Sequence, residues 1–89
     1  MKMRSLQDLA AMRDALAREA VGAFLRSAEQ RGLRCLRVIH GKGHGSPGRE
    51  PVLQAKVHRW LAQRREVIAF AQAAGPQGGA GAVIVLLAS

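Results

Sequence analysis

The chain has 89 residues, of which 14 are Lys or Arg and 6 are Asp or Glu, so its formal net charge is +8. This length allows one two-layer core and no second one, and an apolar fraction of 48% is typical of a globular chain rather than a disordered one. Besides histidine, the aromatic residues are Phe24, Trp60 and Phe70, which argues against a binder that stacks many bases on exposed rings. The single cysteine, Cys35, excludes an internal disulfide.

The sequence has no features of a membrane or secreted protein. Its longest apolar stretch, Ala82 to Ala88, is far shorter than the ~20 residues that span a bilayer. The start, MKMRSLQDL, does not resemble a signal peptide. We therefore expect a single cytoplasmic domain over residues 1–89, with residues 1–4 as a short stub and no membrane partner.

The positive charge is concentrated in the middle of the chain. Residues 37–65 carry seven basic side chains and one acidic side chain, a net charge of +6. Such a basic segment is the electrostatic footprint expected for a nucleic-acid phosphate backbone. The alternative is that these charges are solvated helix faces of an Arg-rich chain.

The first predicted element is a long helix. Ser5 followed by Asp8 resembles a capping box, and apolar residues recur at helical spacing from Leu9 to Phe24. Gly32 suits a left-handed helix cap. The pattern predicts a helix from Leu6 to Arg31.

The rest of the chain predicts a strand, a second helix and two further strands. Leu33–Ile39 is short and apolar and has the features of a buried strand. Pro51 is suited to the first turn of a helix, which we expect to end near Arg65. Val67–Ala73 and Ala82–Leu87 are the next two strand candidates, the second being the stronger.

A glycine-rich segment, HGKGHGSPGRE, connects the first predicted strand to the second helix, where α/β proteins bind anions. It is not a dinucleotide fingerprint, because Pro47 occupies the turn and Gln72 stands where an acid should hold a ribose. It is not a Walker loop, because Gly43 follows Lys42. What remains is either a loop whose N–H groups and Lys42 approach a phosphate, or a plain connection.

Within this segment, two histidines, His40 and His44, flank Gly41-Lys42-Gly43 and suit acid–base chemistry or metal binding. No third metal ligand is evident, since His58 lies further along the second helix and is expected to be off the site. No pair of carboxylates is placed to hold two metal ions. A divalent metal cofactor stays a possibility, although the sequence shows no set of ligands for it.

Three stretches together resemble the small MutS-related (Smr) domain family: LRCLRVIHGKGHGSPG, PVLQAKVHRWL and VIAFAQAAGPQGGAGAVIVLL. The resemblance covers Leu33 to Leu87. It implies a βαβαββ two-layer α/β domain, similar to the C-terminal domain of translation initiation factor three. It also implies nucleic-acid binding and, in many members, nicking of DNA or cleavage of RNA.

One family motif, Leu-Asp-Leu-His-Gly, belongs on a strand directly before the first helix, but only MKMR precedes Ser5 here. We therefore expect a two-layer α/β (α+β) sandwich with that strand missing, in the order α-β-α-β-β. Losing the strand would expose one edge of Leu33–Ile39, through which two copies could pair as a homodimer.

The resemblance assigns roles to the central segment. His40, Gly41, Lys42 and Gly43 correspond to the family's HGKG motif at the floor of its active site. It implies proton transfer by His40 and charge stabilisation on the scissile phosphate by Lys42. The residues expected to contact a DNA or RNA backbone are Gly41, Gly43, His44, Arg49, Lys56 and Arg59. Three functions stay open: a nicking endonuclease, a non-catalytic nucleic-acid-binding domain and a dimerisation module.

Overall fold

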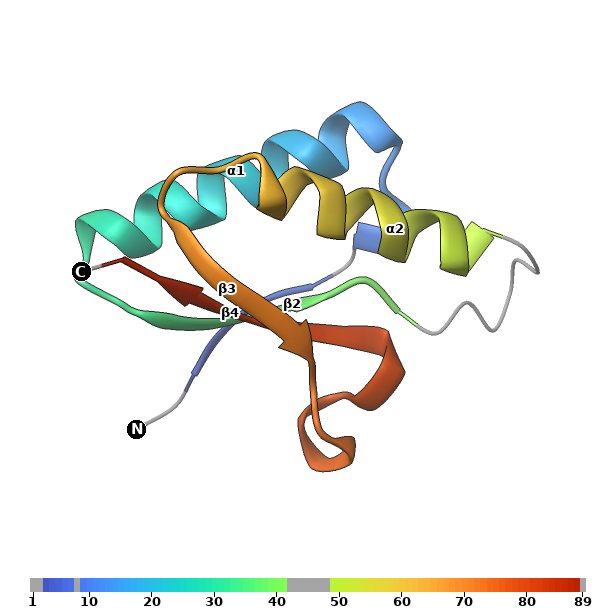
Figure 1. Cartoon of the computed structure of the whole chain (residues 1–89). Helices are drawn as coiled ribbons and strands as arrows, with labels where there is room; N and C mark the ends of the chain where they lie inside the picture. The colour runs from blue at the N-terminus through green and yellow to red at the C-terminus, as the bar shows by residue number, and fades with distance from the viewer. Residues whose placement is uncertain (1–2, 8, 42–48, 89) are drawn as a thin grey trace.

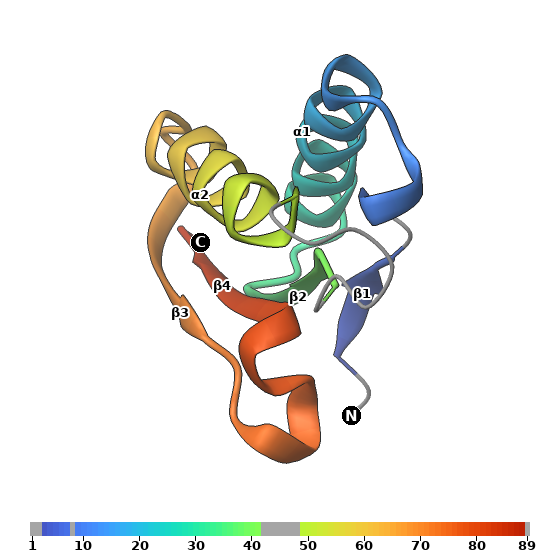
Figure 2. The same cartoon turned by 90° about the vertical axis from the view of Figure 1, so that its right-hand side faces the viewer.

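Two helices lie on one face of a four-stranded sheet, as Figures 1 and 2 show. The computed structural model describes residues 3–7, 9–41 and 49–88. The helices are α1 (Asp14–Gln30) and α2 (Arg49–Ala62). The strands are β1 (Arg4–Leu6), β2 (Cys35–Ile39), β3 (Val67–Gln72) and β4 (Ala82–Leu87), and short 3-10 turns occur at η1 (Leu9–Ala11), η2 (Gly75–Gln77) and η3 (Gly79–Gly81). The predicted two-layer α/β class is confirmed.

The strands are arranged in the order β1-β2-β4-β3. β1 pairs with β2 in parallel, and β4 runs antiparallel to both β2 and β3. The expectation that the first strand is missing is therefore wrong: Arg4, placed in the stub, begins a strand of three residues. Because β2 is paired on both sides, its edge is not exposed, and the expected homodimer contact through that edge is also wrong.

The sequence of β1 does not predict a strand, because β1 is held by backbone pairing and contains a single partly buried apolar side chain, Leu6. The hydroxyl of Ser5, expected to cap a helix, instead accepts a hydrogen bond from Nε of Arg37 on the neighbouring strand, at 2.9 Å. Leu9 keeps its expected core position, but from the turn η1. The first helix consequently begins at Asp14 rather than Leu6.

Helix α1 buries one stripe and ends where the sequence predicts. Ala17, Val21, Leu25 and Ala28 are buried at helical spacing against the sheet. At its end, Gly32 has a φ of 73°, and the N–H of Leu33 donates to the carbonyl of Ala28. This is the Schellman arrangement that satisfies the last carbonyls of a helix.

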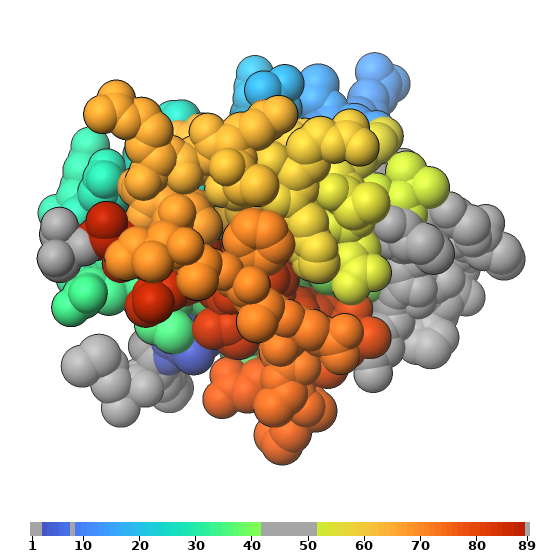
Figure 3. Space-filling model, in the orientation of Figure 1, coloured from blue at the N-terminus to red at the C-terminus, as the bar shows by residue number. Residues whose placement is uncertain are grey.

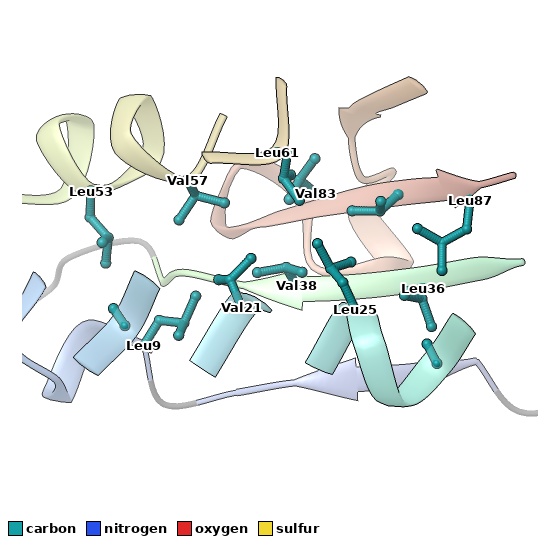
Figure 4. Close-up of a cluster of buried hydrophobic side chains, with 13 residues drawn as sticks. Leu9, Val21, Leu25, Leu36, Val38, Leu53, Val57, Leu61, Val83 and Leu87 are labelled. Carbon is teal, nitrogen blue, oxygen red and sulfur yellow. The ribbon is translucent and has the colours of Figure 1, made fainter. Parts of the chain in front are cut away.

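The core lies between the two helices and the sheet (Figure 4). From α2 it receives Leu53, Val57 and Leu61, as the helical stripe predicted. From the central strands it receives Leu36, Val38, Val83, Val85 and Leu87. Within the described residues, neither helix is long and apolar enough to cross a membrane.

Strand β3 forms one edge of the sheet, and its pairing with β4 shifts by one residue between Val67 and Ala69. An irregularity of this kind makes an edge strand a poorer template for pairing with another chain. After β3, the chain returns to β4 through η2 and η3. Gly78 has a φ of 120°, and a Cβ there would lie 2.7 Å from the Cβ of Ala82, so this turn requires glycine.

Candidate nucleic-acid interface

The HGKG segment leaves the sheet at the carboxyl end of β2. Because β1 and β2 are parallel, their carboxyl ends share one edge of the sheet, and β4 begins at the same edge. In open α/β sheets, this edge is where ligands bind beyond the strands. Figure 1 shows that α2 begins on the same side of the molecule.

His40 and Gly41 are fixed to the sheet by one carbonyl group. The backbone N–H of His40 donates to the carbonyl oxygen of Gly81 at 2.9 Å, and that of Gly41 donates to the same oxygen at 3.0 Å. Gly41 has a φ of 91°, a conformation that favours glycine. The Cβ of Ala10 lies 3.5 Å from the position that a Cβ on Gly41 would occupy, so η1 packs directly against the start of the motif.

The side chain of His40 is buried, with 1% of its surface exposed. Its Nδ1 lies 3.2 Å from the carbonyl oxygen of Gly41. A carbonyl only accepts hydrogen bonds, so a hydrogen bond at this contact is donated by Nδ1–H, in the tautomer that protonates Nδ1. In that tautomer Nε2 carries the lone pair, which is the form of imidazole that accepts a proton.

A second histidine lies beside His40. The ring of His58, on α2, is T-shaped to that of His40, with centroids 6.5 Å apart, and it also contacts the ring of Phe70 with centroids 5.2 Å apart. His58, which the sequence placed further along the second helix, therefore lies beside His40. A sequence signal existed: His58 directly follows Val57 and precedes Leu61 by three positions, at the border of the buried stripe. Figure 3 shows α2 (yellow) against β3 (orange), the strand that carries Phe70.

The basic side chains of the central segment are divided among several surfaces. Lys56 forms an ion pair with Asp14 at the start of α1, so its ammonium group bridges the two helices. Arg59 is exposed on the last turn of α2. On the face of the sheet away from the helices, Arg37 donates to Ser5 and, from Nη1, to the carbonyl of Gln77 at 3.3 Å. Arg64 donates from Nε to Glu66 at 3.0 Å.

For the remaining predicted site residues, the structure gives at most their position in the chain. Lys42, Gly43 and His44 lie outside the described residues. Arg49 is the first residue of α2. In the part of the chain that the structure describes, no group of three or more His, Cys, Asp or Glu side chains is placed to hold a metal ion.

Comparison with known proteins identifies the family. The model of the Smr domain family matches residues 7–88. The chain belongs to the Smr domain family. It is 36% identical over 80 residues to the ribosome rescue factor SmrB of Aliivibrio fischeri, covering 90% of this chain and 42% of that protein. It is also 36% identical over 70 residues to the probable DNA endonuclease SmrA of Escherichia coli, covering 79% of this chain and 37% of that protein.

Two solved Smr structures have the same fold. The stand-alone small MutS-related protein YdaL from Escherichia coli matches with a TM-score of 0.88 and 31% identity, over all of this chain and 67% of that one. The Smr domain of Thermus thermophilus MutS2 matches with a TM-score of 0.79 and 30% identity, over the whole of both chains. Against the curated SmrB and SmrA relatives, by contrast, the chain spans about two fifths of their length.

Proposed function

We propose that this Smr domain binds the phosphate backbone of a nucleic acid at the sheet edge where His40 and Gly41 leave β2. The observation that carries the proposal is the attachment of both backbone N–H groups to the carbonyl of Gly81. This attachment holds the start of the HGKG segment at the carboxyl edge of two parallel strands. A helix follows the segment, and the positive end of a helix dipole favours an anion there.

The charge of the chain supports a polyanionic ligand. A net charge of +8 on 89 residues attracts phosphate backbones without regard to base sequence. Among the relatives, SmrB is named a ribosome rescue factor and SmrA a probable DNA endonuclease, so both RNA and DNA are candidate ligands. Arg59, exposed on α2, is available for backbone contact.

Cleavage of the bound strand is a second candidate function, favoured by the geometry of His40. With the proton on Nδ1, its Nε2 could accept a proton from the attacking oxygen, while Lys42 would stabilise the negative charge on the phosphate. Among the described residues other than its chain neighbours, the side chain nearest to a Cβ on Gly41 is that of Ala10, which carries no acid–base group. Binding is supported by the attachment of His40 and Gly41 to Gly81 and by the net charge, whereas cleavage also requires Lys42, which lies outside the described residues.

Binding is tested by fluorescence anisotropy with a labelled RNA hairpin and a labelled DNA duplex over a range of salt concentrations. We expect the logarithm of the association constant to fall linearly with that of the salt concentration, by about 0.7–0.9 per phosphate contacted. Arg59→Gln should weaken binding, whereas Arg34→Gln is a charge-matched control roughly 20 Å from His40 along the strand. Binding that is absent at low salt, or independent of salt, overturns the proposal.

Cleavage is tested separately with supercoiled plasmid and structured RNA, across divalent metals and pH. If His40 transfers a proton, His40→Asn should abolish cutting by the same preparation. Substrates that stay intact under every condition would leave this chain as a binding domain without nuclease activity.

A further inference from the structure

The outer surface of the helix layer carries a cluster of arginines away from the carboxyl end of β2. Helix α1 comes after β1 in the chain and α2 comes after β2, and these two strands are parallel. The side chains of the two helices meet along a shallow groove. At one end of this groove is the Lys56–Asp14 ion pair. Further along, the side chains of Arg18, Arg26 and Arg64 surround Gly22; we call these three the arginine cluster.

Gly22 makes room for these guanidinium groups. It lies in the middle of α1 and is buried, although glycine is among the least favourable residues in a helix interior. A Cβ at this position would lie 3.2 Å from Nη1 of Arg26 and 3.2 Å from Nη1 of Arg64. Because both lie 3.2 Å from the same point, Nη1 of Arg26 and Nη1 of Arg64 are separated by no more than twice that distance. Two like charges therefore border the space that a side chain would take.

The acidic groups nearby do not neutralise the cluster. Glu66 accepts a hydrogen bond from Nε of Arg64. Burial raises the pKa of Glu66, but a backbone hydrogen bond, the hydrogen bond from Arg64 and the charges of Arg64 and Arg26 together hold that pKa below its usual value. Glu66 is therefore ionised and balances one arginine. Glu19 lines the same hollow as the three arginines, so two carboxylates face three guanidinium groups. Arg18 makes no hydrogen bond or ion pair with any described residue.

A cavity of about 210 Å³ opens between the helices at this point. Its walls are formed by Arg18, Val21, Gly22, Trp60, Gln63 and Arg64. No carboxylate lines it, and the guanidinium and amide groups supply several hydrogen-bond donors. At about 30 Å³ for each water, the volume exceeds what a single phosphate group needs. Paired guanidinium groups are the side chains best suited to bind phosphate oxygens.

We propose that the arginine cluster binds a phosphate group, supplied by the backbone of the nucleic acid that the HGKG edge holds. The identity of the carrier rests on the proposed function, whereas the phosphate site does not. Arg64 lies just beyond α2, whose 14 residues span about 21 Å from the end of the HGKG segment. A nucleic-acid strand that reaches from the HGKG edge to the arginine cluster needs roughly six nucleotides or more, at ~3.4 Å for each nucleotide.

The site itself is tested with inorganic phosphate, followed by NMR of backbone amides in the full chain. We expect saturable shifts at Gly22, Gln63 and Arg64, with at least fivefold weaker binding in Arg18→Gln. Gly22→Ala should weaken binding without a change of charge, because the methyl group shifts the guanidinium groups of Arg26 and Arg64 by a few tenths of an ångström. The matched control is Gly75→Ala, where an added Cβ meets nothing within 4 Å and φ is not positive. Unchanged amides, or Gly22→Ala binding phosphate as the wild type does, overturn the site.

The proposal that the phosphate belongs to a nucleic acid is tested by measuring RNA affinity, with an RNA longer than the roughly six nucleotides needed to reach both sites. Arg18→Gln should lower affinity three- to tenfold and reduce the salt slope by about one phosphate, while the charge-matched Arg34→Gln changes affinity less than twofold. Thermal unfolding checks that each variant is folded. If phosphate binds but RNA affinity is unchanged in Arg18→Gln, the cluster takes a free phosphate and the nucleic-acid assignment is wrong. If the wild type binds no RNA, the proposed function fails, and the phosphate titration still decides the site.

Discussion

The ring of His58 meets the ring of His40 at an interplanar angle of 81°, with 6.5 Å between centroids, and contacts Phe70 on β3. His58 therefore links α2 to the end of β2 from which the HGKG segment departs. Its Nε2 has no hydrogen-bond partner among the residues that the structure describes. We infer that His58 supports His40 through ring contact rather than through a hydrogen bond.

The first prediction concerns this contact. His58→Ala should lower the free energy of unfolding by about 1–2 kcal/mol, because two aromatic contacts are lost, and it should weaken RNA binding by loosening His40. His58→Phe keeps the ring and should retain most of the stability and affinity. Urea unfolding and anisotropy measure both. Equal losses in the two variants would mean that the imidazole nitrogens, not the ring, matter.

A second prediction separates backbone strain from binding at Gly41. Its φ of 91° and the φ of 73° at Gly32 are both left-handed, and neither position has a close clash for a Cβ. Gly41→Ala and Gly32→Ala should each cost about 1–2 kcal/mol of stability. RNA affinity should fall in Gly41→Ala alone, since Gly32 lies at the far end of β2. Loss of affinity in both variants would show that the effect is general destabilisation.

The difference between these two glycines also shows what a sequence can predict. The cap at Gly32 is local: the helix stripe, the glycine and the following Leu33 are adjacent in the chain. The role of Gly41 depends on Gly81, which is distant in sequence and is brought close only by the pairing of β2 with β4. The motif was recognisable, but the carbonyl that holds it was not.

The difference between local and long-range contacts also explains why the sequence did not predict β1, the position of His58 or the arginine cluster. β1 has three residues and depends on β2 for its hydrogen bonds, so no local pattern announces it. The contact of His58 with Phe70 requires β3 to lie under α2, and the arginine cluster requires Arg64, beyond the end of α2, to reach Gly22. The basic residues of the central segment are close together in the sequence, but they are not all close together in the folded chain. Folding places Arg37 on the face of the sheet away from the helices, whereas Lys56 and Arg64 lie at different points along the groove between the helices.

A third prediction tests whether the Asp14 ion pair restrains Lys56. Asp14→Asn should raise RNA affinity about threefold, because Lys56 is released and one negative charge is removed. The two side chains are 42% and 33% exposed, so solvent screening limits the expected stability change to about 0.5 kcal/mol. Glu29→Gln is the charge-matched control at the other end of α1. An equal gain in both variants would assign the effect to net charge alone.

A fourth prediction concerns the acid stability conferred by Glu66. Its pKa is lowered in the folded state, so the stability that it contributes is complete above the unfolded pKa and is lost as pH falls through the folded one. Glu66→Gln should cost about 1–2 kcal/mol at neutral pH, and the gap to the wild type should close in acid. Urea unfolding at stepped pH values measures the gap. A gap that is constant with pH would rule out this ionisation as the cause.

Backbone-amide NMR during titration with a short RNA maps the RNA contact surface most directly. We expect the largest shifts at Ala10, His40, Gly41 and Gly81, with Leu33 and Arg34 at the opposite end of β2 unaffected. Shifts concentrated at Leu33 and Arg34, or no shifts at the His40 edge when RNA is bound, would contradict the proposed function.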